Sequence, residues 1–192
     1  QALVFHSLGQ LVRAENTFQN IRTQDSIVLG VTHPAYAITL SNLGLVYADQ
    51  SKFAAAGRVL QQALTIERAK GGSQSISYAT KLNNLAKVHQ MSGSPERAIP
   101  LLEQAVGIFR KSLGKESPEH ATAIFNLGVA LWKSGKGEQG YKHLRLSAVI
   151  RAKRLGKNHP KYAESILKIA EYQWAKRSIR EAQKSFGEVF DN

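Results

Sequence analysis

Residues 113–133 read LGKESPEHATAIFNLGVALWK, and residues 155–175, which begin 42 positions later, read LGKNHPKYAESILKIAEYQWA. The two stretches share their LGK opening, a proline at the sixth position and apolar or small residues at matching places. Both space their apolar residues by three and four, which is typical of one buried face of an α-helix. Recurrence at a fixed interval indicates a repeat protein, whose stacked units share a continuous core.

The same 42-residue frame extends over the whole chain. We expect a partial repeat over 1–31 and further repeats over 32–73, 74–115, 116–157 and 158–192. A glycine separates each repeat from the next, and several columns of apolar or small residues recur inside them. These columns are Tyr36, Tyr78, His120 and Tyr162; Leu40, Leu82, Ile124 and Ile166; Leu43, Leu85, Leu127 and Ile169; Gly44, Ala86, Gly128 and Ala170; Ala56, Ala98, Gly140 and Ala182; Leu60, Leu102, Leu144 and Phe186.

Each repeat is predicted to contain two helices, a first (A) and a second (B). Proline at the first helical position favours the start of an A helix, and a glycine after each B helix favours its end. The spacing predicts A helices over 34–49, 76–91, 118–133 and 160–175, and B helices over 11–28, 53–69, 95–112, 137–154 and 179–190. No stretch has the pattern of a strand. We therefore expect an all-α protein, a single right-handed α-solenoid over 1–192 with about 4.5 repeats of antiparallel helix pairs.

The composition excludes several classes of protein. The chain has 192 residues and no cysteine, so it can form neither disulfides nor thiolate metal sites. No apolar stretch approaches the ~18 residues of a membrane-spanning helix, and the N-terminus does not resemble a signal peptide. These features favour a cytoplasmic location. Because residue 1 is not methionine, we expect a fragment of a longer protein.

The positive charge is concentrated in the second half of the chain. The formal net charge is +12, of which residues 1–96 contribute +3 and residues 97–192 contribute +9. Residues 133–161 contain nine basic side chains and one acidic side chain, Glu138. Such a region attracts anions, whether acidic peptides, nucleic acid or an anionic membrane surface, or it serves only as a solvated basic face.

The sequence gives no sign of an enzyme. The GKGEQG stretch at 135–140 matches a dinucleotide-binding pattern, but it lies between two helices where that pattern needs a preceding strand. No nucleophile is paired with a base, so no catalytic residue is predicted. His33 and His159 stand at helix starts, where capping suits them better than metal binding. We expect no metal and no cofactor.

The repeat resembles the tetratricopeptide repeat, in the 42-residue form of kinesin light chains. The residues that carry the resemblance are LSNLG at 40–44, LNNLA at 82–86, IFNLG at 124–128 and the linkers LGKESP and LGKNHP. The resemblance covers essentially the whole chain, and it implies a protein-interaction module whose A helices line a concave groove. In such domains an asparagine at the position of Asn42, Asn84 and Asn126 commonly pairs with a peptide backbone.

The candidate binding residues lie on the A helices. An asparagine amide both donates and accepts hydrogen bonds, lysines can neutralise carboxylates or phosphates, and large apolar groups can form a pocket wall. Alternatively the asparagines bond to their own neighbouring helices, and Trp132 packs between repeats. The predicted peptide-binding residues are Asn42, Asn84, Lys87, Phe125, Asn126, Val129, Trp132, Lys133 and Lys168.

The leading hypothesis is a non-enzymatic scaffold that binds an extended or short helical segment of another protein, acidic and carrying an aromatic residue. One alternative is a module for nucleic acid or an anionic surface that uses 133–161, although no regular two-residue code per repeat, as in helical RNA-reading repeats, is found. Another is a regulatory arm of a larger multidomain protein. The oligomeric state is left open.

Overall fold

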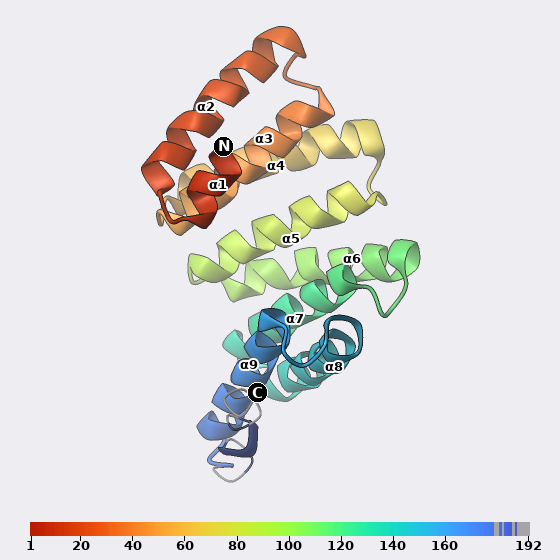
Figure 1. Cartoon of the computed structure of the whole chain (residues 1–192). Helices are drawn as coiled ribbons and strands as arrows, with labels where there is room; N and C mark the ends of the chain where they lie inside the picture. The colour runs from red at the N-terminus through yellow and green to blue at the C-terminus, as the bar shows by residue number, and fades with distance from the viewer. Residues whose placement is uncertain (179–180, 182, 186, 188–192) are drawn as a thin grey trace. The chain divides into compact units, whose positions relative to one another are not determined.

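The computed structural model describes residues 1–178, 181, 183–185 and 187. These residues contain no β-strand, which confirms the predicted all-α class. Figure 1 shows the order of the helices along the chain. They are α1 (Ala2–Ser7), α2 (Leu11–Val28), α3 (Pro34–Asp49), α4 (Phe53–Gly71), α5 (Ile76–Met91), α6 (Pro95–Leu113), α7 (Pro118–Lys133), α8 (Gly137–Leu155) and α9 (Pro160–Ala175).

The chain divides into two compact units, unit 1 (Gln1–Leu101) and unit 2 (Leu102–Asn192). The helix pair α3 and α4 packs together in unit 1, and the equivalent pair α7 and α8 packs together in unit 2. A single solenoid domain over 1–192 stays a prediction.

The predicted helix boundaries agree closely with the structure. The A helices α3, α5, α7 and α9 begin and end at the predicted residues, and the B helices α4, α6 and α8 end one or two residues later than predicted. The B helix predicted over 179–190 lies largely outside the described residues, although 181, 183–185 and 187 are helical. Helix α1 aligns, in the 42-residue frame, with the last six residues of the A helix α3.

The starts of the A helices are fixed by side chains just before them. The His33 ring accepts a hydrogen bond from the Ala35 amide at 3.1 Å, and His159 does the same for Lys161. Ser75 and Ser117 cap the other two A helices in the same way. These bonds satisfy backbone donors that have no partner inside the helix, and they confirm capping roles for His33 and His159.

The core is built from the recurring columns. The 42-residue frame predicts which described positions are buried in all four repeats, and each of the following side chains is buried. They are Tyr36, Leu40, Leu43, Leu60, Tyr78, Leu82, Leu85, Leu102, His120, Ile124, Leu127, Leu144, Tyr162, Ile166 and Ile169. The column members Ala182 and Phe186 lie outside the described residues. Burial of the same column in successive repeats is what stacking one helix pair on the next produces.

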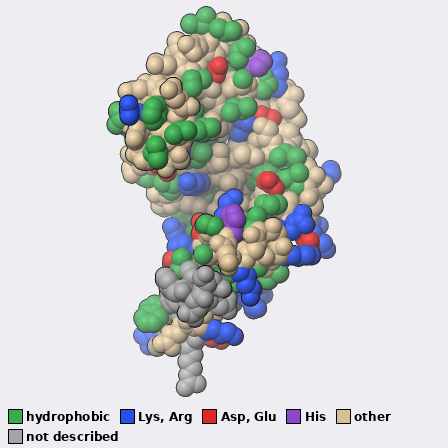
Figure 2. Space-filling model, in the orientation of Figure 1, with side chains coloured by type: hydrophobic (Ala, Val, Ile, Leu, Met, Phe, Trp, Pro, Cys, Tyr) green, Lys and Arg blue, Asp and Glu red, His purple; other side chains and the backbone are tan. Residues whose placement is uncertain are grey.

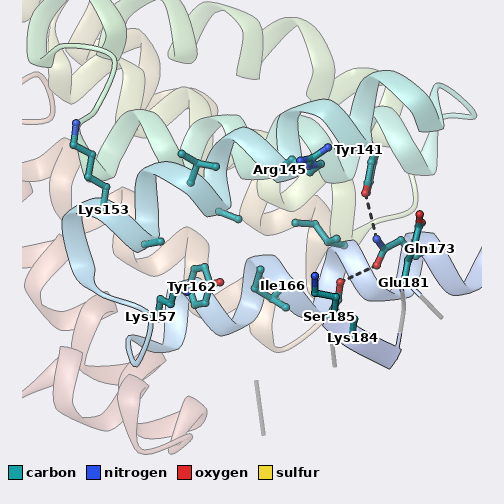
Figure 3. Close-up of a pocket in the computed structure, with 14 residues that line it drawn as sticks. Tyr141, Arg145, Lys153, Lys157, Tyr162, Ile166, Gln173, Glu181, Lys184 and Ser185 are labelled. Atoms are coloured by element: carbon teal, nitrogen blue, oxygen red, sulfur yellow. Dashed lines mark hydrogen bonds between the residues drawn. The ribbon is translucent and has the colours of Figure 1, made fainter. Parts of the chain in front are cut away.

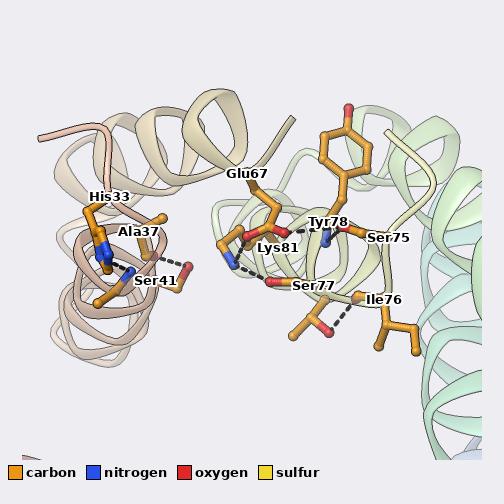
Figure 4. Close-up of polar contacts among 11 residues, drawn as sticks. His33, Ala37, Ser41, Glu67, Ser75, Ile76, Ser77, Tyr78 and Lys81 are labelled. Atoms are coloured by element: carbon orange, nitrogen blue, oxygen red, sulfur yellow. Dashed lines mark hydrogen bonds and ion pairs between the residues drawn. The ribbon is translucent and has the colours of Figure 1, made fainter. Parts of the chain in front are cut away.

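A buried ion pair joins α4 to α5 in unit 1 (Figure 4). Lys81 Nζ donates to Glu67 Oε2 at 3.0 Å and to Ser77 Oγ at 2.7 Å, and Ser75 Oγ donates to Glu67 Oε1 at 3.2 Å. Burial raises the pKa of Glu67, but the hydrogen bonds from Lys81 and its neighbouring serines outweigh burial, so the net pKa is lowered. The carboxylate is therefore charged at neutral pH and tied to its lysine.

Candidate functional site

Four side chains occupy one equivalent position on the A helices, which we call the amide column. Asn42 on α3, Asn84 on α5, Asn126 on α7 and Lys168 on α9 are all partly exposed. The side chains of Asn42 and Asn84 make no hydrogen bond to another described residue, whereas Asn126 interacts within the chain. Asn42 and Asn84 thus offer both a donor and an acceptor to an incoming ligand.

The three predicted binding lysines differ in whether they already form an ion pair. Lys87 and Lys133 are exposed, and neither forms an ion pair with a described residue. Lys168 instead donates to both carboxylate oxygens of Glu171, at 2.8 and 2.7 Å, one turn along the same helix. Lys168 is therefore already neutralised, while Lys87 and Lys133 carry charge that a ligand can meet.

Phe125 and Val129 lie in the core and not on an exposed wall. They are 5% and 8% exposed and pack in one cluster with Leu144 of α8 and Ile166 of α9. The Arg151 guanidinium covers the Phe125 ring at 4.4 Å from its centre. Their burial is a correction to the expected pocket wall: both side chains hold α7, α8 and α9 together and do not form an exposed wall.

Trp132 belongs to an aromatic cluster that also joins three helices. Its ring meets the ring of Tyr172 edge-on at 5.7 Å, and Tyr172 stacks on Tyr141 at 4.8 Å. The Tyr172 hydroxyl donates to Glu138 at 2.7 Å, and burial together with this bond raises the pKa of Tyr172 to about 12. Trp132 is half-buried, and part of its ring packs against Tyr172 of the next repeat.

The basic region 133–161 is less uniform than its sequence suggests. Arg151 is 2% exposed, and its Nη1 donates to the Lys161 carbonyl at 2.7 Å, Ser165 Oγ at 2.8 Å and Glu164 at 3.1 Å. Burial lowers the pKa of Arg151, and Glu164 partly offsets this. Arg151 is therefore a structural link between α8 and α9.

Other cations of this region are exposed, and Figure 2 shows lysine and arginine side chains gathered over unit 2. Lys153 pairs with Glu116 at 2.7 Å. Lys142, Arg145 and Lys157 are exposed without an ion pair to any residue that the structure describes. The surface of unit 2 therefore keeps much of the positive charge.

Two grooves beside α8 were not anticipated from the sequence. The first, the α6–α8 groove, has a volume of about 850 Å³ and a floor that includes Val106, Ile124 and Ile150. The second, the α8–α9 groove, has a volume of about 790 Å³ and a floor that includes Ala148 and Ile166 (Figure 3). The sequence feature that could have pointed to these grooves is the pair Leu146 and Val149, two apolar residues among the basic side chains of α8.

The lining of the α6–α8 groove includes a neutral histidine and two permanently charged side chains. Burial lowers the pKa of His120, and its hydrogen bond to the Lys115 carbonyl, at 2.9 Å, only partly offsets this, with Arg110 lowering the pKa further. His120 is therefore neutral at pH 7. The fixed positive charges of this groove are Arg110 and Lys115.

The described residues contain no group of three or more metal-ligating His, Asp or Glu side chains. None of the described helices has the length and apolar character that crossing a membrane requires.

Comparisons with known proteins agree with the repeat frame. The model of a family described as tetratricopeptide repeat matches residues 1–69 and 77–139. No curated protein matches the chain in sequence.

Several solved structures share the fold. Nearly identical TPR-like repeats of a kinesin light chain type from Podosopora anserina are 25% identical, cover 99% of this chain and 90% of their own, and superpose with a TM-score of 0.79. BtubC (BKLC) from P. vanneervenii is 20% identical over 99% of this chain and 76% of its own, with a TM-score of 0.81. MamA is 17% identical over 99% and 92%, with a TM-score of 0.63.

Proposed function

Because the chain belongs to the tetratricopeptide repeat family, we propose that it is a non-enzymatic interaction module that holds an extended, acidic segment of a partner protein on the exposed face of its A helices. The repeats of this family, and its kinesin light chain-like members, typically act as scaffolds between proteins. The acidic ligand and its position on the A helices are our own inference.

The observation that carries the proposal is the amide column. Asn42 and Asn84 recur one repeat apart in unit 1, partly exposed and without a hydrogen-bonding partner among the described residues. A peptide backbone presents N–H and C=O groups along its length, and an asparagine amide can satisfy one of each. Two such amides on neighbouring A helices suit an extended segment regardless of its side chains.

Charge narrows the class of ligand. Lys87 lies one turn after Asn84 on α5, and Lys133 lies at the end of α7 after Asn126. Both ammonium groups are exposed and unpaired among described residues, so a carboxylate in the ligand gains an attraction without breaking an existing ion pair. Each unit by itself therefore presents amide and lysine side chains on its A helices.

The proposal is tested with a displayed library of short acidic peptides that contain one aromatic residue. The tightest binder is measured by calorimetry against the parent chain, Lys87→Glu, Lys133→Glu and the control Arg68→Glu. Arg68 is an exposed residue of the B helix α4. We expect affinity near micromolar, about −8 kcal/mol, that falls with Lys87→Glu and Lys133→Glu but not with Arg68→Glu. Equal losses in all three variants would refute a specific A-helix face.

A further inference from the structure

We propose that the outer surface of α8, together with the two grooves beside it, is a second docking site, for an acidic amphipathic helix of a partner protein. We call this region the α8 surface and define it by Leu146 and Val149, the α6–α8 groove and the α8–α9 groove. It is centred on the B helix α8 and shares no lining residue with the proposed peptide face that carries Asn42, Asn84, Lys87 and Lys133.

The two grooves are equivalent features of successive repeats. Val106 and Ile124 in the first groove stand 42 residues before Ala148 and Ile166 in the second. Each groove is also lined by a lysine, Lys115 or Lys157, again 42 residues apart. The grooves therefore arise from the repeat itself, with an apolar floor from an A helix and its neighbouring B helices and a lysine from the linker before that A helix.

Helix α8 presents apolar side chains between the grooves. Leu146 is 48% exposed and Val149 is 65% exposed, and Val149 lines both grooves. An exposed aliphatic ridge between two apolar grooves makes one continuous apolar surface. Contiguous apolar surface of this kind, rimmed by charged residues, marks interaction sites.

The rim of the α8 surface carries positively charged side chains, and most of them have no acidic partner among the described residues. Arg110 and Lys115 line the first groove, and Arg145 and Lys157 line the second; none of them forms an ion pair with a residue in the described part of the chain. Glu116 lines the first groove and is already held by Lys153 at 2.7 Å, while Glu181 lines the second groove together with a further lysine, Lys184. The surface thus pairs an apolar centre with unneutralised cations.

Charge complementarity and the apolar floor together select the occupant. A helix with apolar residues on one face and Glu or Asp beside them places its apolar side chains in the grooves and its carboxylates at the rim. Volumes of about 790 and 850 Å³ leave room for several such side chains. Nucleic acid would meet the cations with its phosphates but would leave the apolar floor uncovered, so we infer an acidic protein segment.

The test uses a synthetic fluorescein-labelled peptide of leucine and glutamate, with the leucines on one helical face, and measures fluorescence anisotropy at physiological salt. The parent chain is compared with Val149→Asp, Arg110→Glu and Lys157→Glu. Matched controls are Ile27→Asp, an exposed apolar residue of α2, and Lys136→Glu, an exposed lysine outside both grooves. Circular dichroism melts check that each variant is folded.

We expect at least a tenfold loss of affinity in each of the three α8-surface variants and no loss in the two controls. Lys87→Glu should also leave binding of this peptide unchanged, which separates it from the A-helix proposal. Three results would overturn the inference: no binding by the parent below 100 µM (about −5.5 kcal/mol), equal binding of a peptide of the same composition with scattered leucines, or displacement by duplex DNA at comparable concentration.

Discussion

Gly128 of α7 and Gly140 of α8 lie in direct contact where the two helices cross. A Cβ atom placed on Gly140 would stand 2.5 Å from the carbonyl oxygen of Gly128 and 2.8 Å from the amide nitrogen of Trp132. Both neighbours are backbone atoms, so neither can rotate away. The glycine pair therefore sets how closely the helices of this repeat approach each other.

The first prediction concerns this crossing. Gly140→Ala should destabilise the protein by about 1–3 kcal/mol, because the added methyl group forces α7 and α8 apart. Gly57→Ala is the matched control: Gly57 lies inside α4, and nothing lies within 4 Å of its added Cβ. That change should stabilise by about 0.5–1 kcal/mol through helix propensity. Urea unfolding measures both values, and effects of the same sign would contradict the prediction.

The second prediction concerns the buried guanidinium of α8. Arg151→Met keeps a side chain over Phe125 but removes the charged donor to the Lys161 carbonyl and to Ser165 Oγ, and leaves the carbonyl only the longer bond from Ser165 Oγ at 3.3 Å. We expect a loss of about 1–3 kcal/mol in unfolding free energy, the typical contribution of hydrogen bonds made by a charged group.

Lys153→Met on the same helix is the control for Arg151→Met. It removes an exposed ion pair with Glu116, and pairs of that kind contribute little. Its melting temperature should therefore stay close to that of the parent. A larger drop for Lys153→Met than for Arg151→Met would rule out the structural role of Arg151.

The third prediction is the pH dependence of the Glu67–Lys81 pair. The folded-state pKa of Glu67 lies below its ordinary value of 4.5, so folding favours the charged carboxylate. The pair therefore makes its full contribution to the unfolding free energy when the pH is above 4.5, the ordinary pKa of Glu67. That contribution is lost as the pH falls through the lower pKa of the folded state. Melting temperatures between pH 7 and pH 3 should show this loss in the parent.

Lys81→Met should lower the unfolding free energy and change how it depends on pH. It leaves the Glu67 carboxylate buried without its cation, a change that typically costs about 3–5 kcal/mol at neutral pH. Protonation then relieves the unpaired charge, so the variant should lie closer to the parent at pH 4 than at pH 7. The double variant Glu67→Leu with Lys81→Met should recover part of the loss; no recovery would argue against a buried pair.

The fourth prediction follows from the proposed peptide face. Asn84→Ala should weaken a bound acidic peptide by about 1–3 kcal/mol, because a backbone group of the ligand loses its partner. Unfolding free energy should hardly change, since the Asn84 side chain makes no hydrogen bond to another described residue. Calorimetric titration beside a urea melt distinguishes the two effects, and unchanged peptide affinity would remove Asn84 from the site.

The fifth prediction concerns nucleic acid. Binding through the exposed cations of unit 2 releases counterions, so affinity for duplex DNA or RNA should fall steeply with salt. We expect weak association at low salt that is absent at ~150 mM. A sub-micromolar complex at that salt concentration would make nucleic acid the better candidate ligand.

The sequence by itself was sufficient to predict the helices. Because the pattern of an A helix and a B helix recurs every 42 residues, a weak helix signal in one repeat is supported by the same positions in the others. Pro34, Pro118 and Pro160 mark the starts of their A helices, and the structure begins those helices at the same residues. Helix caps and helix ends depend on residues that are adjacent in the chain, and for that reason they could be predicted closely from the sequence.

Tertiary structure decided which side chains of those helices are available to a ligand. Helical spacing places Phe125 and Val129 near the expected groove, but the side chains of α8 and α9 cover them. In the sequence Arg151 is one of the nine basic residues of 133–161, yet in the structure α9 provides three acceptors for its guanidinium. The grooves beside α8 exist only once its neighbours are packed around it. A residue's exposure depends on helices distant in the chain, and the periodicity of one helix does not contain that information.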